Sequence, residues 1–424
     1  MYAAALHLAA IWNVKAKSWV EGRKNWQNKI ELWKSADKKK YNPPAALPEA
    51  AAAKTIWMHC ASLGEFEQGR PLLEALKTQW PGCKIVLTFF SPSGYEIRKH
   101  YEGADLVMYL PMDGAANAAA FVETINPSLV LWVKYEYWHY YLSALKKRKI
   151  PVLLISGIFR ETQPFFAWYG SFWKNMLTCF HHLFVQTKAS QELLRQIDFS
   201  ANSTVAGDTR FDRVIAIAGS HEAIASQVKQ FCANRPVIVA GSSWEEDEEE
   251  LMHYTRTHPN VKFIIAPHET GKERIVDLQK EFPGSLLYSS FISKPFEESP
   301  VSNVLIVDNV GTLARLYKYA TIAYVGGGFN QSGIHNILEA AVYGKPVIFG
   351  PVYEKFAEAR DLVEAGGAFS IENALELEAL LSKLLENEEE LSEAGRISEA
   401  YVRSHQGATA SIMNYIQINR LLIS

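Results

Sequence analysis

Short apolar runs alternate with amphipathic segments along almost the whole chain, and this alternation most constrains its fold. TIWMHC (55–60) and KIVLTFF (84–90) are largely apolar, and each is followed by a segment with helical spacing. Strands that are apolar on both faces are typical of parallel sheets covered by helices. The sequence therefore predicts an α/β protein of doubly wound parallel sheets.

The alternation restarts at PVIVAGSS (236–243), so two α/β domains follow one another. A chain of 424 residues also exceeds one ordinary core. We expect two Rossmann-like, doubly wound domains that face a central cleft. The expected segments are a basic leader at 1–41, an N-terminal acceptor domain at 42–205, a C-terminal donor domain at 206–402, and a final helix at 403–424 that can pack back on the N-terminal domain.

Charge is concentrated near the start of the chain. Residues 15–40 hold nine Lys and Arg against three acids, a local charge of +6, whereas the whole chain carries −3. The overall charge predicts no binding to nucleic acid, and the basic block favours an anionic surface or ligand.

The apolar stub MYAAALHLAAIW is shorter than the roughly 20 residues of a membrane span. With the Trp and Lys/Arg residues that follow, it predicts a helix lying in a membrane interface. The alternative is a surface helix packed on its own domain.

Metal and thiol chemistry find little support in the sequence. The four cysteines are scattered without CxxC pairs, which argues against a zinc site or a disulfide framework and fits a reducing cytoplasm. GxSxG, HExxH and DxD patterns are absent. We expect no metal and no cofactor.

The most specific motif is YVGGGFNQSGIHNILEAAVYGKPVIFGP at 324–351. A strand ends in three glycines, another glycine follows, and a helix is expected to begin near His335 or Asn336. Such glycines let the backbone approach a ligand, and a helix N-terminus attracts phosphate; the alternative is that the glycines serve packing only. The spacing matches neither GxGxxG nor a Walker loop. The candidate donor-binding residues are Gly327, Gly328, Gly333, His335, Asn336 and Glu339, the last on the first helical turn.

The motif AGSSWEEDEEE (240–250) begins at the end of another apolar strand. Its acids are expected to cap a helix, with Ser242 or Ser243 paired to Glu245 or Glu246 in a capping box. The two serines lie where ligands of parallel sheets bind, so they are also candidate donor contacts.

Four further polar residues are candidates by position. His268 in IIAPHE ends a strand, and Arg210 in GDTRFDRV has a fork that fits phosphate or carboxylate. Glu136 lies among aromatic residues in VKYEYWHYY, which suggests sugar contact or a structural acid. Glu65 in HCASLGEFEQGR either caps a helix or carries chemistry.

Together these motifs resemble bacterial 3-deoxy-D-manno-octulosonic acid (Kdo) transferases, which are GT-B glycosyltransferases. The segments that carry the resemblance are WMHCASLGEFEQGRPLL, VKYEYW, GDTRFD, AGSSW, GGGFNQSGIHNILEAAVYGKPVIFGP and the leader NVKAKSWVEGRKNW. These motifs occur in the order expected for the family and are spread over nearly the whole chain.

The resemblance implies a reaction in which Kdo passes from CMP-Kdo to the lipid A precursor with inversion, at the cytoplasmic face of the bacterial inner membrane. By position, Glu65 matches the family's catalytic base, and Ser62, Gly64 and Glu136 lie on the acceptor side. Arg210, Ser242, Ser243, His268 and the glycine-motif residues match the donor side.

One departure concerns the anion contacts. The family often has Pro-Arg-His where this chain has Pro267-His268-Glu269. If that Arg contacts the phosphate or the Kdo carboxylate, either His268 substitutes for it more weakly or Arg210 or Lys272 supplies the positive charge. Two other functions fit the same residues. One is a sugar-nucleotide epimerase of the same fold, and the other is a non-catalytic, membrane-associated nucleotide-binding protein.

Overall fold

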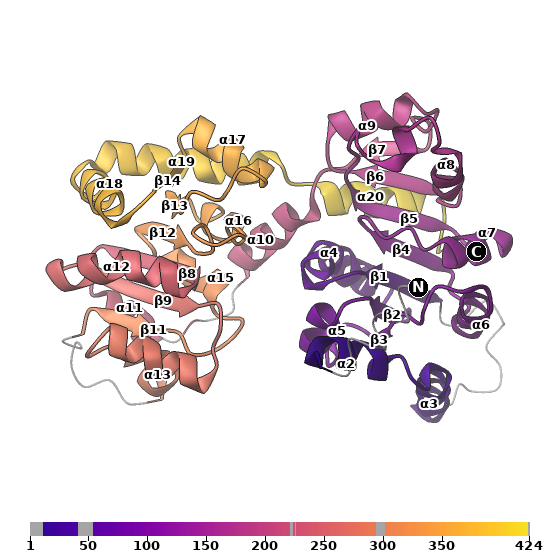
Figure 1. Cartoon of the computed structure of the whole chain (residues 1–424), viewed down its shortest axis with the longest axis horizontal. Coiled ribbons are helices and arrows are strands. Elements are labelled where there is room, and N and C mark those ends of the chain that lie inside the picture. Colours follow the sequence, from indigo (N-terminus) through magenta and orange to yellow (C-terminus); the bar gives the residue numbers. More distant parts are fainter. Residues whose placement is uncertain (1–11, 41–53, 221–223, 225, 294–301, 423–424) are drawn as a thin grey trace. The chain divides into compact units, whose positions relative to one another are not determined.

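A computed structural model of the chain describes residues 12–40, 54–220, 224, 226–293 and 302–422. The chain divides into two compact units: one holds residues up to 213 together with 406 onwards, and the other holds 214–405. Each contains one parallel sheet of seven strands (Figure 1). The predicted α/β class with two doubly wound sheets is confirmed.

The N-terminal unit has strands in the order β3-β2-β1-β4-β5-β6-β7. The strands are β1 (Thr55–Cys60), β2 (Lys84–Phe89), β3 (Leu106–Tyr109), β4 (Leu129–Val133), β5 (Val152–Gly157), β6 (His182–Val185) and β7 (Ser203–Val205). The helices are α2 (Val14–Gly22), α3 (Trp26–Lys40), α4 (Leu63–Gln79), α5 (Pro92–Arg98), α6 (Ala115–Ile125), α7 (His139–Lys147), α8 (Ser171–Leu177), α9 (Lys188–Arg195) and α20 (Ala408–Ile418), with a 3-10 turn, η2 (Pro164–Phe166). Helix α10 (Thr209–Gly219) begins in this unit and continues into the second. The strand order reverses between β1 and β4, which is where doubly wound sheets bind ligands.

Alternate residues of β1 explain why this sheet is buried on both faces. Trp57 packs with α6, and its ring centroid lies 5.0 Å from that of Phe121. Met58, the next residue, belongs to a core that includes α4 and α20. Successive side chains of a strand point to opposite faces, so a continuous apolar run fills two cores.

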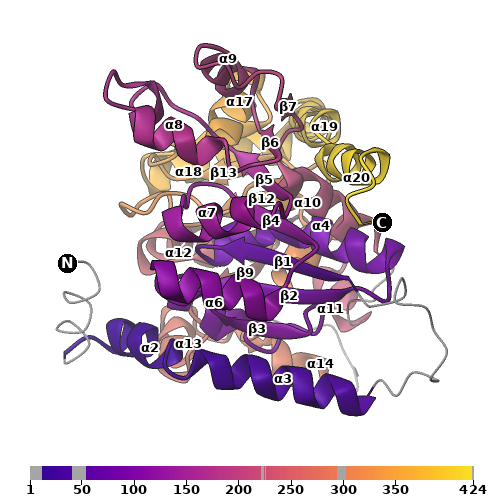
Figure 2. The same cartoon turned by 90° about the vertical axis from the view of Figure 1, so that its right-hand side faces the viewer.

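The leader helices α2 and α3 pack on the N-terminal unit, beside β3 in Figure 2. Trp19 and Trp26 are each only 5% exposed, and Ile30 is fully buried. Arg23 is buried too, and its guanidinium donates to the carbonyls of Trp19, Leu110 and Phe90 at 2.7–3.0 Å. The prediction that this Trp/basic pattern forms a membrane face is therefore wrong for both tryptophans, because their rings fill the protein's own core.

Other parts of the leader remain on the surface. Lys17, Lys24 and Lys34 are exposed, and Trp12 is 82% exposed. The first 11 residues of the apolar stub and the Pro/Ala-rich segment 42–53 lie outside the described residues. Within the described part of the chain, every helix is too short or too polar to cross a membrane.

Helix α20 packs on α4 and completes the N-terminal unit. Ile412 and Ile416 are fully buried there. Asp212 accepts hydrogen bonds from the backbone N–H groups of Gly407 and Thr409 at 2.6 Å each, so it satisfies free donors at the start of α20. The final helix thus lies with the first unit, although it follows the second one in sequence.

The second unit has the order β10-β11-β9-β8-β12-β13-β14. Its strands are β8 (Val237–Ser243), β9 (Lys262–Pro267), β10 (Leu286–Leu287), β11 (Val304–Ile306), β12 (Ile322–Val325), β13 (Val347–Phe349) and β14 (Ala368–Ser370). Its helices are α11 (Ser226–Cys232), α12 (Glu245–Thr257), α13 (Lys272–Glu281), α14 (Tyr288–Ile292), α15 (Leu313–Leu316), α16 (Leu338–Ala341), α17 (Ala357–Ala365), α18 (Ala374–Glu386) and α19 (Glu388–Ser404), with the 3-10 turn η3 (Tyr317–Tyr319). Here the order reverses between β8 and β12.

The leader packing yields a stability prediction. We expect Trp26→Ala to lower the free energy of unfolding of the N-terminal unit by about 3 kcal/mol, because it removes a buried ring and leaves a cavity. Trp12→Ala, the same change at an exposed ring, should alter it by less than about 0.5 kcal/mol. Chemical denaturation measures both values. Equal effects would show that α3 is not part of the unit's core.

Candidate active site

Glu65 lies on the first turn of α4, directly after the carboxyl end of β1. Its side chain is 8% exposed, and its carboxylate accepts a hydrogen bond from the Ala61 backbone N–H. Ser62 is the N-cap by position, but its side chain makes no capping bond. Gly64 is exposed, with open space where a Cβ would be. Glu65 therefore satisfies a backbone donor while remaining at the edge of the sheet.

The pKa of Glu65 is raised to about 7. Burial is the main cause, because it disfavours the charged carboxylate. The Ala61 N–H acts in the opposite direction, the negative charge of Glu136 raises the pKa further, and Lys134 lowers it. A carboxyl with this pKa exchanges its proton near neutral pH, as a general base requires.

Glu136 follows β4, so it stands at the other strand of the reversal point. Its Oε2 atom lies 2.8 Å from Nε2 of His59 and accepts a hydrogen bond from the Trp138 indole at 3.1 Å. His59 is a fully buried residue of β1. The sequence prediction missed His59, whose only signal was one imidazole inside an otherwise apolar strand.

A buried polar chain extends from this pair into the sheet. Nδ1 of His59 lies 2.9 Å from the Thr88 hydroxyl, which also accepts from the Trp57 indole at 2.8 Å. The Thr88 hydroxyl also lies 3.4 Å from the Met58 carbonyl, to which it can donate. The chain fixes the orientation of both His59 and Glu136.

Arg210 lies in the N-terminal unit, apart from the other predicted donor-binding residues, which all lie in the second unit. Its guanidinium forms an ion pair with Asp208 at 2.8 Å, and its backbone N–H donates to the same carboxylate at 2.9 Å. Asp208 is buried and also accepts from Gln68, three residues after Glu65. The GDTRFD motif is therefore hydrogen-bonded to α4 through Asp208 and Gln68.

In the second unit the glycine motif forms a tight turn after β12. Gly327 and Gly333 have φ values of +92° and +77°, which favour glycine. A Cβ on Gly328 would lie 2.5 Å from the backbone of Gly350. Packing thus accounts for part of the pattern. The Gly327 N–H donates at 2.8 Å to Asp247, a buried residue of α12, which ties the turn to the end of β8.

The predicted capping box is wrong. Trp244 is the N-cap, and Asp247, in place of Glu245 or Glu246, accepts from its backbone N–H at 2.9 Å. The reason is that β8 continues through Ser243, which moves the N-cap one residue later. The Trp244 indole can only donate, so the reciprocal half of a capping box is not formed. Ser242 has a φ of +54°, a backbone conformation that is costly for a residue other than glycine.

Three aromatic rings gather at the ends of β8, β9 and β12. His268 stacks on both Trp244 and His335, with ring centroids 4.5 Å apart in each case. The Trp244 indole N–H donates to Nε2 of His335 at 3.1 Å. Two of the predicted residues, His268 and His335, are therefore brought together, and Trp244 joins them although the sequence interpretation gave it no role.

The prediction of a helix beginning near His335 or Asn336 is wrong. Helix α16 begins at Leu338 and has four residues, so it offers only a weak dipole. Glu339 does lie on its first turn. The Asn336 amide donates to Glu339 at 3.3 Å, and both side chains are partly exposed.

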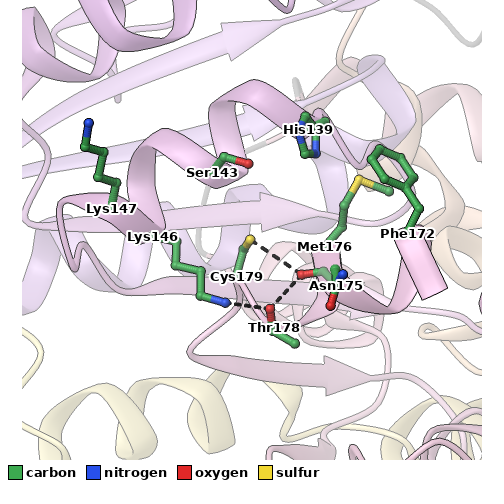
Figure 3. A pocket seen from close by; sticks show the side chains of 9 residues that line it. All are labelled: His139, Ser143, Lys146, Lys147, Phe172, Asn175, Met176, Thr178 and Cys179. Atoms are coloured by element: carbon green, nitrogen blue, oxygen red, sulfur yellow. Dashed lines mark hydrogen bonds between the residues drawn. The ribbon is translucent and has the colours of Figure 1, made fainter. Parts of the chain in front are cut away.

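A groove of about 410 Å³ lies elsewhere on the N-terminal unit, between α7 and α8 (Figure 3). The Lys146 ammonium donates to the Thr178 hydroxyl at 2.6 Å across it. Its lining includes none of the predicted site residues. Among the described residues, no group of three or more His, Cys, Asp or Glu side chains is placed to hold a metal ion.

Comparison with known proteins links these motifs to one family. A family model described as 3-deoxy-D-manno-octulosonic-acid transferase matches residues 24–213. The 3-deoxy-D-manno-octulosonic acid transferase of Aquifex aeolicus is 27% identical over 359 residues, which cover 83% of this chain and 92% of that protein. The Bordetella pertussis transferase is 26% identical over 403 residues, covering 91% and 92%. The chain is therefore similar to Kdo transferases over most of its length.

Solved structures agree on the GT-B-like fold. The UDP-GlcNAc 2-epimerase of Neisseria meningitidis superposes with a TM-score of 0.59 at 17% identity, over 86% of this chain and 99% of that one. Acinetobacter baumannii MurG gives 0.52 at 14% identity, also over 86% and 99%. At such identities the likeness concerns the fold alone. The resemblance inferred from the motifs, Kdo transferase of the GT-B type, is thus confirmed.

The two acids at the reversal point yield a titration prediction. We expect Glu136→Gln to lower the pKa of Glu65 below about 7, because it removes a nearby negative charge while keeping an acceptor for His59. A ¹³C NMR titration of the Glu65 carboxyl measures this. Glu67→Gln is the matched control, since Glu67 is paired with Arg98 at 2.7 Å. An unchanged Glu65 pKa in Glu136→Gln would contradict the electrostatic link.

The burial of Glu65 also predicts a pH-dependent stability difference. The native pKa of about 7 exceeds the ordinary 4.5, so ionising Glu65 costs native stability as pH rises from about 4.5 through 7. We expect Glu65→Gln to match the wild type at pH 4.5 and to be more stable at pH 8, by at most about 3 kcal/mol. Urea unfolding at both pH values tests this. An equal difference at the two pH values would contradict the raised pKa.

Proposed function

We propose that this protein is an inverting glycosyltransferase that moves Kdo from CMP-Kdo to the lipid A precursor. The observation that carries the proposal is the half-neutralised carboxyl of Glu65 at the end of β1. Its motif lies within the segment matched by the Kdo transferase family. The names of the relatives support Kdo as the transferred group.

In the proposed mechanism Glu65 is the general base. The acceptor hydroxyl loses its proton to the Glu65 carboxylate while its oxygen forms a bond to C2 of Kdo. The bond from C2 to the phosphate oxygen breaks, and CMP leaves with the electron pair. Attack opposite to the leaving group inverts the configuration at C2. One carboxylate suffices for such a displacement, whereas a retaining enzyme would need a second group as nucleophile.

Glu136 serves this step as a positioning acid. Its carboxylate is fixed by His59 and Trp138, and its charge helps to keep the Glu65 pKa high. A higher pKa makes Glu65 a stronger base once it is ionised. The acceptor-side role of Ser62 and Gly64 rests on their place at the start of α4 beside Glu65, where Ser62 is partly exposed and Gly64 is exposed.

The second unit is proposed to bind the donor. Ser242, Ser243 and the glycine turn lie at the β8/β12 reversal, the usual ligand position in such sheets. His268, His335, Asn336 and Glu339 are further proposed donor contacts of this unit, and Arg210 of the first unit remains a proposed donor contact. The proposal requires no metal or cofactor, and hydrogen bonds would stabilise the charge that develops on CMP.

We further propose peripheral association with the cytoplasmic face of the inner membrane. Because Trp19 and Trp26 are buried, this contact would depend on exposed cations such as Lys17, Lys24 and Lys34. Cations near an anionic lipid surface each contribute about 1 kcal/mol.

A transfer assay with CMP-Kdo and lipid A precursor tests the function. We expect Glu65→Gln to lower kcat/KM by about 10²-fold or more, the usual contribution of a general base. Glu67→Gln should stay within a few-fold, because it alters only a partly exposed ion pair near the same helix start.

The pH profile gives a second readout of the same experiment. Wild-type kcat/KM should rise with pH, reach half its maximum near pH 7 and level off above pH 8, because only ionised Glu65 accepts a proton. Full transfer by Glu65→Gln would refute the base assignment. CMP-Kdo consumed without any acceptor would favour the epimerase, and binding without turnover would favour the non-catalytic alternative.

A further inference from the structure

Trp244 and His335 form a hydrogen-bonded pair of rings at the ends of β8 and β12. Their planes are inclined by only 14°, and the indole nitrogen lies 3.1 Å from Nε2 of His335. His268 covers both rings, at 4.5 Å from each. The loop is anchored on both sides: the His335 backbone N–H donates to Gly326 at 3.0 Å, and the Trp244 backbone N–H donates to Asp247.

The chemistry of indole decides the protonation of His335. The indole N–H can only donate, so Nε2 of His335 must carry a lone pair. A neutral imidazole then has its single proton on Nδ1. Forming the cation would put a second proton on Nε2 and set two donors against each other at 3.1 Å.

The groups around the ring agree with this arrangement. Burial lowers the pKa of His335 to about 4, and His268 acts in the same direction. The pKa of His268 is lowered by burial as well, with Glu269 acting against that shift. Asp247, a buried acid of α12, accepts hydrogen bonds from the N–H groups of Trp244 and Gly327 and from the Tyr324 hydroxyl. In the part of the chain that is described, Nδ1 of His335 has no hydrogen-bond partner.

We propose that Trp244 is a positioning residue that holds His335 as a neutral imidazole with its proton on Nδ1, and that this N–H donates to a phosphate oxygen of the nucleotide donor. The hydrogen bond to the phosphate, called the ligand half of the proposal, rests on the proposed function, in which this loop binds CMP-Kdo. The position of the proton on Nδ1, called the tautomer half, does not depend on that function. His335 therefore contributes a directed hydrogen bond instead of a positive charge.

A neutral donor has a distinct consequence for binding. An imidazolium would attract phosphate only below its pKa, so affinity would fall as pH rises through the physiological range. A neutral N–H donor keeps the same strength on both sides of pH 7. Nucleotide affinity at this site should thus be nearly independent of pH, although two histidines are present.

NMR of the full chain without ligand tests the tautomer. Long-range ¹⁵N–¹H correlations should show the proton of wild-type His335 on Nδ1 from pH 5 to 8. Trp244→Phe keeps a stacking ring but removes the N–H that Nε2 accepts, so part of the His335 population should move its proton from Nδ1 to Nε2. Trp168→Phe, the same type of change at a ring that is 94% exposed on the N-terminal unit, should change nothing at His335. A wild-type proton on Nε2, or an unchanged His335 in Trp244→Phe, would overturn the proposal.

Calorimetry with cytidine 5′-(methyl phosphate) tests the ligand half, because this diester has no phosphate oxygen that titrates between pH 5 and 8. Wild-type affinity should be flat over that range. In Trp244→Phe it should be lower than in the wild type by about threefold at every pH, since a His335 ring with its proton on Nε2 presents a lone pair to the phosphate. A wild-type affinity that rises at acid pH with His335 protonation would overturn the neutral-donor role.

Two substitutions of His335 provide a check that does not depend on Trp244. The amide nitrogen of Asn occupies the place of Nδ1, and that of Gln occupies the place of Nε2. We expect His335→Asn to retain nucleotide affinity within about threefold and His335→Gln to lose about tenfold, the worth of one hydrogen bond. The reverse order would overturn the Nδ1 assignment. Absence of binding by the wild type would overturn the ligand half and count against the proposed function, while NMR would still decide the tautomer.

Discussion

Each sheet of this protein is parallel and buried on both faces, and this burial determines where polar chemistry can occur. Because helices or loops cover both faces, charged side chains reach solvent mainly where strands end. The strand order reverses between β1 and β4 in one unit and between β8 and β12 in the other. Glu65 and Glu136 follow the first pair of strands, and Trp244 and the glycine turn follow the second. The candidate site residues of each unit thus lie where the same topological rule expects ligands to bind.

Burial at these edges acts on acids and bases in opposite directions but favours the neutral form of each. It raises the pKa of Glu65 to about 7 and lowers that of His335 to about 4. At neutral pH the first group can exchange a proton, whereas the second stays uncharged. Specific partners then set the details, since Glu136 adds a negative charge near Glu65 and Trp244 supplies a donor to His335. Burial alone would not distinguish the proton-exchanging role of Glu65 from the role of His335 as an uncharged ring.

The leader illustrates how one sequence pattern serves packing and surface charge together. Alternating aromatic and basic residues are typical of interfacial helices. In the leader, however, Trp19, Arg23 and Trp26 are buried against the N-terminal unit, and the Arg23 guanidinium donates to three backbone carbonyls. Exposed lysines remain on helices α2 and α3. The positive charge is therefore held on a fixed scaffold next to the first sheet.

The sequence by itself determined the α/β class, the two sheets and the placement of Glu65 and the glycine motif at strand ends, because periodicity and strand-end position are local properties. Its ordered motifs also carried the resemblance to Kdo transferases. Only the tertiary structure decided that Asp247, and not a glutamate, caps α12, that α16 begins at Leu338, and that His59 and Trp244 hold their neighbours in place. These contacts join residues 77 to 91 positions apart or depend on where a strand stops. Such partners are chosen by strand order and packing, which the local pattern of a single segment does not contain.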